Sequence, residues 1–200
     1  MPVQLPPPVF CHSLPRITIG RTLILPVRLG GLVNPKAQPG DQYRYYASIS
    51  LTGRMAKASF YILTSGSPQE RYFYACKVIE KAYRSGHFCY VLTDSIKQSQ
   101  YLDDLLWTFR EGSFIPHQLY TGEIPDFKKV ILIGSLDAPE HWKKTIINLS
   151  SQCPKYFESA ERIFEILDNS EEIKEPGRNR FLQYQQSGIA TTIHKIAHTA

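Results

Sequence analysis

Four residues near the C-terminus combine positive charge with an aromatic ring on one side of a predicted helix. In a continuous helix they stand at positions i, i+4, i+7 and i+11, the spacing that brings side chains to one face: Lys174, Arg178, Phe181 and Gln185. A guanidinium beside an aromatic side chain suits a peptide that ends in an apolar residue with a free carboxylate. The pattern therefore indicates a peptide-binding face, with Arg180 and Tyr184 on the adjoining face.

Two properties of this segment leave alternatives open. Phe181 and Tyr184 could pack inward beneath an ordinary surface helix, in which case the face has no ligand. Pro176 either kinks the helix or is its first residue, because proline is tolerated in the first turn and lacks an amide needed further along. If Pro176 is the first residue, Lys174 leaves the stripe and Arg178 lies in the first turn.

A second candidate surface is apolar and lies in the middle of the chain. A helix there has a core-facing stripe at i, i+3, i+4 and i+7: Leu102, Leu105, Leu106 and Phe109. Trp107 lies off this stripe, about 140° around the helix from Leu102 at about 100° per residue. Phe114 follows in a loop. Because large aromatic side chains anchor interfaces, Trp107 and Phe114 form a candidate partner-binding surface. Alternatively, both fold back onto a neighbouring layer.

Catalytic chemistry finds little support in the sequence. The turn after the first predicted strand, residues 64–70, is where a doubly wound domain would hold a phosphate. It contains a single glycine, Gly66, and matches neither glycine-rich phosphate motif. Pro68 removes an amide, and Glu70 adds negative charge at the mouth of the helix. His117 is the one histidine we consider for proton transfer, and we favour a role in fixing its loop. We therefore expect no catalytic residue and no cofactor.

Composition restricts the functions open to the chain. Residues 1–54 hold six of the 23 basic residues and one of the 18 acidic ones, which leaves 17 of each in residues 55–200. A neutral main domain has no global electrostatic reason to bind a phosphate backbone. The four cysteines form no Cys-x-x-Cys pair, so a zinc site is not expected. No run approaches the roughly 18 apolar residues of a membrane span, and we expect a cytoplasmic protein without membrane contact.

Alternating elements predict the fold that positions these residues. Apolar runs predict five strands, at residues 59–64, 88–93, 129–134, 144–149 and 162–167. Capping residues and glycines predict helices from Pro68 to Gly86, after Ser95, at 155–161, and from Asn169 or Ser170 to Gly188. Such alternation is typical of an α/β fold, a three-layer α/β/α sandwich with a mainly parallel five-stranded sheet. It is Rossmann-like without a nucleotide site. Residues 189–200 are expected to be extended.

The first quarter of the chain differs from the rest. Residues 1–54 hold eight of the 14 prolines and show no helix or strand period. We interpret them as a disordered, basic extension, because such a segment cannot bury enough apolar surface to offset its ordering entropy. Met55 opens directly into the first strand pattern, so our hypothesis is that Met55 is the true start and the extension a start-site artefact. A genuine basic tail is the alternative. Residues 55–200 form a single domain.

Two motifs make the chain resemble a known family. Leu102-Asp-x-x-Leu-Trp107 is followed by Ser113-Phe-Ile-Pro-His117, and Gly177-Arg-x-Arg-Phe-x-x-Tyr-x-x-x-Gly188 lies near the other end. In order and spacing these motifs resemble the chi subunit of bacterial DNA polymerase III, from about Met55 to Ile196. The resemblance implies an α/β/α fold with a parallel five-stranded sheet. It also implies a non-catalytic accessory subunit of the clamp-loader complex.

The same resemblance implies partners and residues. Chi binds the psi subunit, which tethers it to the clamp loader, and Trp107 and Phe114 match the psi-facing surface. Chi also binds the acidic, phenylalanine-ended tail of single-stranded DNA-binding protein, and six residues match or adjoin that site: Lys174, Arg178, Phe181, Leu167 as a pocket wall, and Thr192 or Ile193 nearby. In some relatives an iron–sulfur helicase competes with psi. DNA is contacted only indirectly.

Some positions depart from the family pattern, and other functions remain as alternatives. Phe181 stands where some relatives have tyrosine, and Leu182 and Gln185 stand where some have basic residues, so the pocket here is expected to be less cationic. A small nucleotide-handling α/β enzyme would need a phosphate-binding turn or an acid–base pair. A direct single-strand binder is opposed by the neutral charge of residues 55–200 and by the lack of alternating aromatic and basic residues on the strands.

Overall fold

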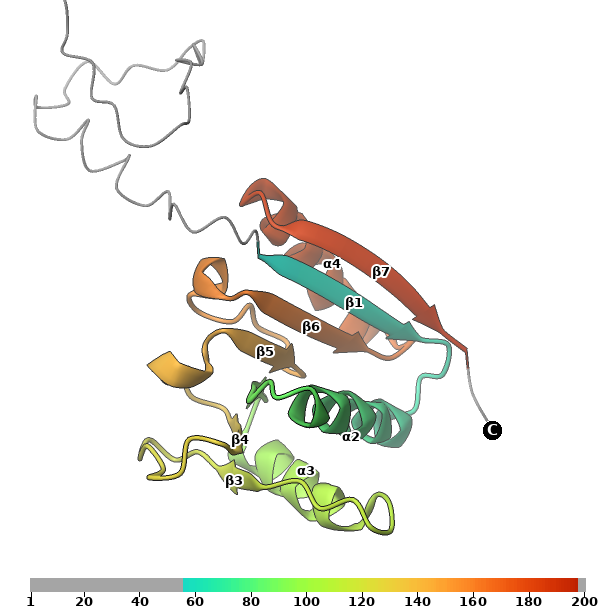
Figure 1. Cartoon of the computed structure of the whole chain (residues 1–200). Coiled ribbons are helices and arrows are strands. Elements are labelled where there is room, and N and C mark those ends of the chain that lie inside the picture. The colour runs from blue at the N-terminus through green and yellow to red at the C-terminus, as the bar shows by residue number, and fades with distance from the viewer. Residues whose placement is uncertain (1–55, 198–200) are drawn as a thin grey trace, which may run out of the picture. The chain divides into compact units, whose positions relative to one another are not determined.

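The computed structural model describes residues 56–197. The expectations for residues 1–54, including a start at Met55, lie outside the described residues. The elements in chain order are β1 (Lys57–Leu63), α2 (Pro68–Arg84), β2 (Tyr90–Leu92), α3 (Ile96–Thr108), β3 (His117–Leu119), β4 (Ile131–Gly134), η1 (Glu140–Trp142), β5 (Thr145–Asn148), η2 (Phe157–Ser159), β6 (Arg162–Leu167), α4 (Glu171–Gln186) and β7 (Ala190–Ile196). Figure 1 shows the strands in a twisted sheet, with the helices packed against it.

The three longer predicted helices begin where their capping residues indicated. The Ser67 hydroxyl accepts a hydrogen bond from the Glu70 amide, and Pro68 is the first residue of α2. The Ser95 hydroxyl caps α3 in the same way, at 3.3 Å from the Gln98 amide. The α4 helix runs through Pro176, so Lys174 remains in the predicted stripe. The helix expected at 155–161 is only the short 3₁₀ turn η2.

All strand pairs in the described range are parallel, in the order β3-β4-β2-β5-β6-β1-β7. The predicted α/β fold is confirmed, but this sheet has seven strands rather than five. The two additional strands, β3 and β7, are the edges, and each pairs with a single neighbour. The side chains of β3 and β7 are half-buried or exposed. Their sequences lack the continuous apolar run that marks a strand buried on both faces, which is why neither strand was predicted.

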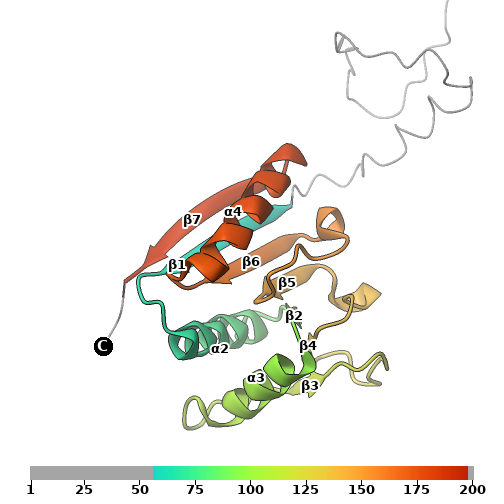
Figure 2. The ribbon, with the colours of Figure 1, turned by 180° about the vertical axis from the view of Figure 1, so that it is seen from behind.

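The sheet is covered on both faces, which gives the three predicted layers. The α2 and α3 helices lie on one face and α4 lies behind the sheet, as Figures 1 and 2 show from opposite sides. Successive side chains of a strand point to opposite faces. Accordingly Ile166 belongs to the core cluster beneath α2 and α3, whereas Ile163 belongs to the cluster beneath α4. Trp142 of η1 covers the part of the sheet that α4 does not reach, and its indole donates to the Val130 carbonyl at 2.7 Å.

Candidate functional site

The aromatic corner, which we define as Trp107, Phe114 and His117, lies at the end of α3 and in the loop after it. Trp107 is 57% exposed and Phe114 is 71% exposed, so neither folds back onto a neighbouring layer. Their ring centroids are 6.0 Å apart. Leu102 and Leu106 on the opposite side of α3 are fully buried, which fixes the rotation of the helix and turns Trp107 outward.

His117 holds the aromatic corner in place. Its side chain is almost fully buried, and its Nδ1 lies 2.6 Å from the Ile115 carbonyl oxygen. Its Nε2 lies 3.3 Å from the Asp103 carbonyl oxygen, and the ring centroid is 4.8 Å from that of Trp107. Burial raises the pKa of the Asp103 carboxyl, an effect that His117 opposes and Asp104 reinforces. These contacts agree with our interpretation of His117 as a residue that fixes its loop.

The α4 face, which we define as Lys174, Arg178, Phe181 and Ile193, is the second candidate surface. Lys174 and Arg178 both form ion pairs with Glu171, at 2.8 and 2.9 Å. Phe181 is half-buried and packs edge-on against Phe60 of β1, with ring centroids 5.3 Å apart. Because the ion pairs are at the surface, they contribute little, and an incoming carboxylate could replace Glu171.

Strand geometry separates the other residues predicted for this surface. Ile193 is in register with Phe60, whose side chain packs beneath α4, so Ile193 lies on the same face of the sheet and is 52% exposed. Thr192 lies on the opposite face, because neighbouring strand residues alternate. Leu167 is buried beneath Gly177, where an added Cβ would lie 2.6 Å from Leu167 Cδ1. Leu167 therefore supports α4 from below rather than lining an open pocket.

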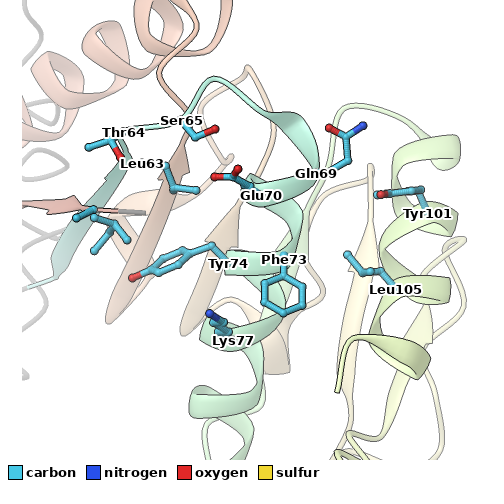
Figure 3. Close-up of a pocket in the computed structure, with 12 residues that line it drawn as sticks. Leu63, Thr64, Ser65, Gln69, Glu70, Phe73, Tyr74, Lys77, Tyr101 and Leu105 are labelled. Atoms are coloured by element: carbon cyan, nitrogen blue, oxygen red, sulfur yellow. The ribbon is translucent and has the colours of Figure 1, made fainter. Parts of the chain in front are cut away.

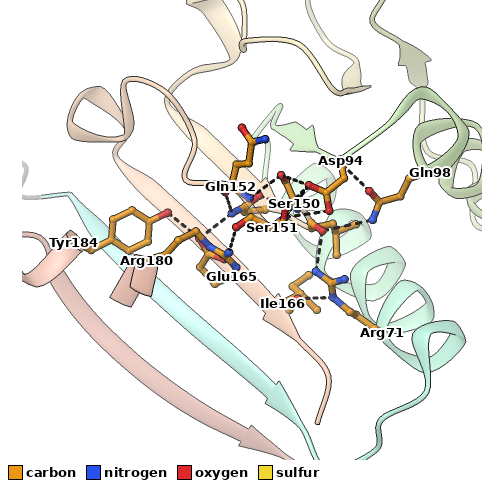
Figure 4. A network of polar contacts seen from close by, with 12 residues as sticks. Arg71, Asp94, Gln98, Ser150, Ser151, Gln152, Glu165, Ile166, Arg180 and Tyr184 are labelled. Atoms are coloured by element: carbon orange, nitrogen blue, oxygen red, sulfur yellow. Dashed lines mark hydrogen bonds and ion pairs between the residues drawn. The ribbon is translucent and has the colours of Figure 1, made fainter. Parts of the chain in front are cut away.

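Arg180 and Tyr184 face the sheet, not the surface beside the predicted stripe. Arg180 Nε and Nη2 donate to Glu165 Oε2 at 3.0 and 2.8 Å, and Nη1 donates to the Ser151 carbonyl at 2.7 Å. The Tyr184 hydroxyl donates to Glu165 Oε1 at 2.7 Å (Figure 4). The Asn148 amide donates to the same oxygen at 3.0 Å. Burial and the Glu165 charge raise the pKa of Tyr184. Sequence analysis missed this network, although a glutamate inside a predicted buried strand was a usable signal.

A second polar network ties the carboxyl ends of the central strands together. Asp94, just after β2, accepts hydrogen bonds from the Ser150 and Ser151 hydroxyls at 2.6 and 2.9 Å and from the Ser151 amide (Figure 4). Burial alone would raise the pKa of Asp94, but these hydrogen bonds outweigh it and lower the pKa. Arg71 of α2 is buried and donates to the Ile166 and Leu149 carbonyls at 2.7 and 2.8 Å.

A groove of about 370 Å³ lies beside the turn at residues 64–70 (Figure 3). Its walls are mainly apolar and aromatic, and include Phe73, Tyr74, Tyr101 and Leu105. In the turn the Ser67 amide already donates to Ser65 Oγ at 3.1 Å and the Glu70 amide donates to Ser67 Oγ. A phosphate bound here would compete with these hydrogen bonds and would face the Glu70 carboxylate. This geometry gives no support to the alternative of a nucleotide-handling enzyme.

Two further properties concern the described residues alone. Between residues 56 and 197, no three His, Cys, Asp or Glu side chains converge on a point where a metal ion could bind. None of the helices in this range is both long enough and apolar enough to cross a membrane.

Comparison with known proteins gives one consistent match. A family model described as DNA polymerase III chi subunit, HolC, matches residues 55–192. The chain is 29% identical over 142 residues to DNA polymerase III subunit chi of Pseudomonas aeruginosa, which covers 71% of this chain and 98% of that protein. It is 29% identical over 136 residues to the protein of the same name from Haemophilus influenzae, and this alignment covers 67% of this chain and 94% of the relative.

The solved structures include one with a related fold. The crystal structure of T4 UvsW matches with a TM-score of 0.51 at 10% identity, over 71% of this chain and 42% of that chain. At this identity the likeness concerns the fold alone.

Proposed function

Because the chain belongs to the DNA polymerase III chi subunit family, we propose that it is a non-catalytic link in the replication complex, joining the psi subunit to single-stranded DNA-binding protein. The observation that carries the proposal is the presence of two different surfaces at opposite edges of the sheet. The aromatic corner adjoins β3, whereas the α4 face adjoins β7. Partners at these two places would therefore not compete for the same residues.

The aromatic corner suits an apolar partner, and we assign it to psi. Exposed tryptophan and phenylalanine side chains are frequent hot spots of protein interfaces. His117 and Ile115 hold the loop that carries Phe114, so little ordering entropy is lost when a partner binds. An iron–sulfur helicase that competes with psi would use the same residues.

The α4 face suits a peptide that ends in an apolar residue and a carboxylate, and we assign it to the tail of single-stranded DNA-binding protein. Arg178 and Lys174 would bind the terminal carboxylate through charge-assisted hydrogen bonds. Phe181 and Ile193 form the apolar part of the surface. The Ala190 amide and the Ile196 carbonyl point toward β1, so the backbone groups of Thr191 and Ile193 point to the outer edge of β7. These groups could bind the backbone of an extended tail.

Point variants separate the two surfaces. Arg178→Ala should weaken binding of a tail peptide by about 1.5–3 kcal/mol, or roughly tenfold or more, and leave psi binding within about twofold. Trp107→Ala and Phe114→Ala should have the reverse effect, with a loss of about 2 kcal/mol or more. Isothermal titration with each partner measures both effects, and Lys128→Ala, an exposed lysine outside both surfaces, is the control.

Two results would contradict the proposal. If Arg178→Ala weakens psi and the tail equally in a folded protein, the two surfaces are not separate. If it weakens neither, the tail binds elsewhere. Circular dichroism of each variant distinguishes these outcomes from a loss of folding.

A further inference from the structure

A third surface has no role in the proposed function. It lies on the sheet face opposite α4, where Figure 1 shows β1 and β7 open beside α2. We call it the stacking platform and define it by four rings: Tyr61, Tyr74, Phe164 and His194. The Tyr61 ring stacks with His194 at 4.9 Å and 19° and with Phe164 at 6.3 Å and 29°, and it meets Tyr74 at 5.7 Å. The rings come from β1, β6, β7 and α2, and none is fully buried.

Positive charge borders these rings. A groove of about 370 Å³ runs along the platform, and its cationic and titratable walls are Lys77, Lys81, His87 and Arg162. Among the described residues that line this groove, none is acidic. Within residues 56–197 neither Lys81 nor Arg162 forms an ion pair, in contrast to Arg178 on the α4 face. Lys57 extends the positive border, because it is in register with Arg162 on the neighbouring strand.

We propose that the stacking platform binds single-stranded nucleic acid directly, contrary to the sequence-based expectation that DNA is contacted only indirectly. Aromatic rings stack with unpaired bases irrespective of sequence, and a positively charged groove follows the phosphates. The platform offers both, with flat rings on the strands and Lys81 and Arg162 at the border. A duplex is disfavoured, because its bases are already stacked on one another and cannot reach the rings.

A polyanion is attracted to the groove even though residues 55–200 are neutral as a whole, because none of the residues that line the groove in the described range is acidic. Glu80 lies outside this lining and is held by Arg84 and Arg110.

The platform would supply a contact that a link through single-stranded DNA-binding protein lacks. Its position on the face opposite α4 leaves the α4 face free, so a tail peptide and a DNA strand could be held together. This surface was not predicted from the sequence, because Tyr61 and Phe164 are over 100 positions apart and only the β1–β6 pairing brings them side by side.

Fluorescence anisotropy of labelled dT20 with the full chain tests the proposal, and rU20 and a dT20–dA20 duplex are the comparison ligands. Lys81→Glu/Arg162→Glu should lower the affinity for dT20 at least tenfold. Lys97→Glu/Lys128→Glu is the matched control, because it makes the same change in net charge at exposed lysines outside the groove, and it should change the affinity less than threefold. Lys81→Ala/Arg162→Ala should also reduce the slope of log K against log salt by about 1.4, at about 0.7 per phosphate contact.

The rings have their own variants. His194→Ala and Tyr61→Leu should each weaken dT20 at least about fivefold, the low end of base stacking on an aromatic side chain. Thermal melting confirms that each variant is folded. His194 is exposed on the edge strand, so His194→Ala keeps the test valid if Tyr61→Leu does not fold. If the variants lose the same affinity for dT20 and rU20, the site binds single strands of DNA and RNA alike. If they lose affinity for only one of the two, the site is specific for that nucleic acid.

Three results would overturn the proposal. Platform variants that bind dT20 as well as the wild type would place any binding outside the platform. Equal losses in the platform and control pairs would show a net-charge effect only. Platform variants that keep dT20 binding but lose psi or the tail would make this surface a protein-docking face. The first two results do not bear on Arg178 or Trp107. The third bears on the proposed function only if Arg178→Ala and Trp107→Ala also leave tail and psi binding intact, so failure here is distinguishable from failure of the proposed function.

Discussion

Arg180→Ala should be among the most destabilising single substitutions in the protein, although Arg180 lies on a helix with an exposed, charged side. Arg180 is 3% exposed and Glu165, its partner on β6, is 0% exposed. Two of the three hydrogen bonds from its guanidinium go to Glu165 Oε2, and the third goes to the Ser151 carbonyl. Alanine would leave the Glu165 carboxylate buried with only Asn148 and Tyr184 as donors.

The expected cost follows from that uncompensated charge. Removing one partner of a buried ion pair costs about 3–5 kcal/mol, which is a large fraction of the roughly 5–15 kcal/mol that stabilises a typical domain. At about 2–4 °C for each kcal/mol in a protein of this size, the melting temperature should fall by about 6–20 °C. The loss of the hydrogen bond to the Ser151 carbonyl lowers the stability further.

Urea unfolding followed by circular dichroism measures the change, and an unchanged m-value would show that the transition remains two-state. Arg178→Ala is the matched control, because it makes the same substitution two positions away on α4. Its ion pair with Glu171 is at the surface, so the free energy of unfolding should change by about 0.5 kcal/mol or less.

A double-mutant cycle with Glu165→Gln isolates the pair itself. The double variant should lose less stability than the sum of the losses in the two single variants, with a coupling of about 1–3 kcal/mol. Each single variant leaves one buried charge without its partner, whereas the double variant removes both charges. If Arg180→Ala costs less than about 1 kcal/mol, or if the coupling is absent, the Glu165 network does not hold α4 on the sheet and our account of the helix orientation is wrong.

Two further predictions concern α4 and the strand ends. Gly177→Ala should lower the free energy of unfolding by about 1–3 kcal/mol despite the better helix propensity of alanine, because its Cβ would lie 2.6 Å from Leu167 Cδ1; an equal or greater stability in urea would show that Leu167 has room to move. Hydrogen bonds lower the pKa of Asp94 in the folded state. The Asp94 carboxylate therefore stabilises the fold fully above its ordinary pKa of 3.8, and this stabilisation is lost as the pH falls through the lower, folded-state pKa. Wild type should therefore be more stable than Asp94→Asn near pH 6, and the two should converge below pH 3.8, as thermal melts over this range would show.

Local patterns in the sequence determined the elements that bury one side. Ser67 and Ser95 predicted the starts of α2 and α3, and Leu102 and Leu106 predicted which side of α3 is buried and hence that Trp107 lies outside it. The resemblance to the family was also recognisable in the sequence, from the residues of the two motifs and their order. These relations span two to eleven positions, the range over which helix and strand periods act.

The tertiary structure decided what depends on residues far apart in the chain. β7 became a strand only because it pairs with β1, and that register decided that Ile193, rather than Thr192, lies on the α4 face. Arg180 turned inward because Glu165, 15 positions earlier, lies beneath α4 and has no other ion-pair partner among residues 56–197. Tyr61, Phe164 and His194 became one platform because three strands lie side by side. A period within one element cannot encode such contacts, because they depend on the order in which the strands assemble into the sheet.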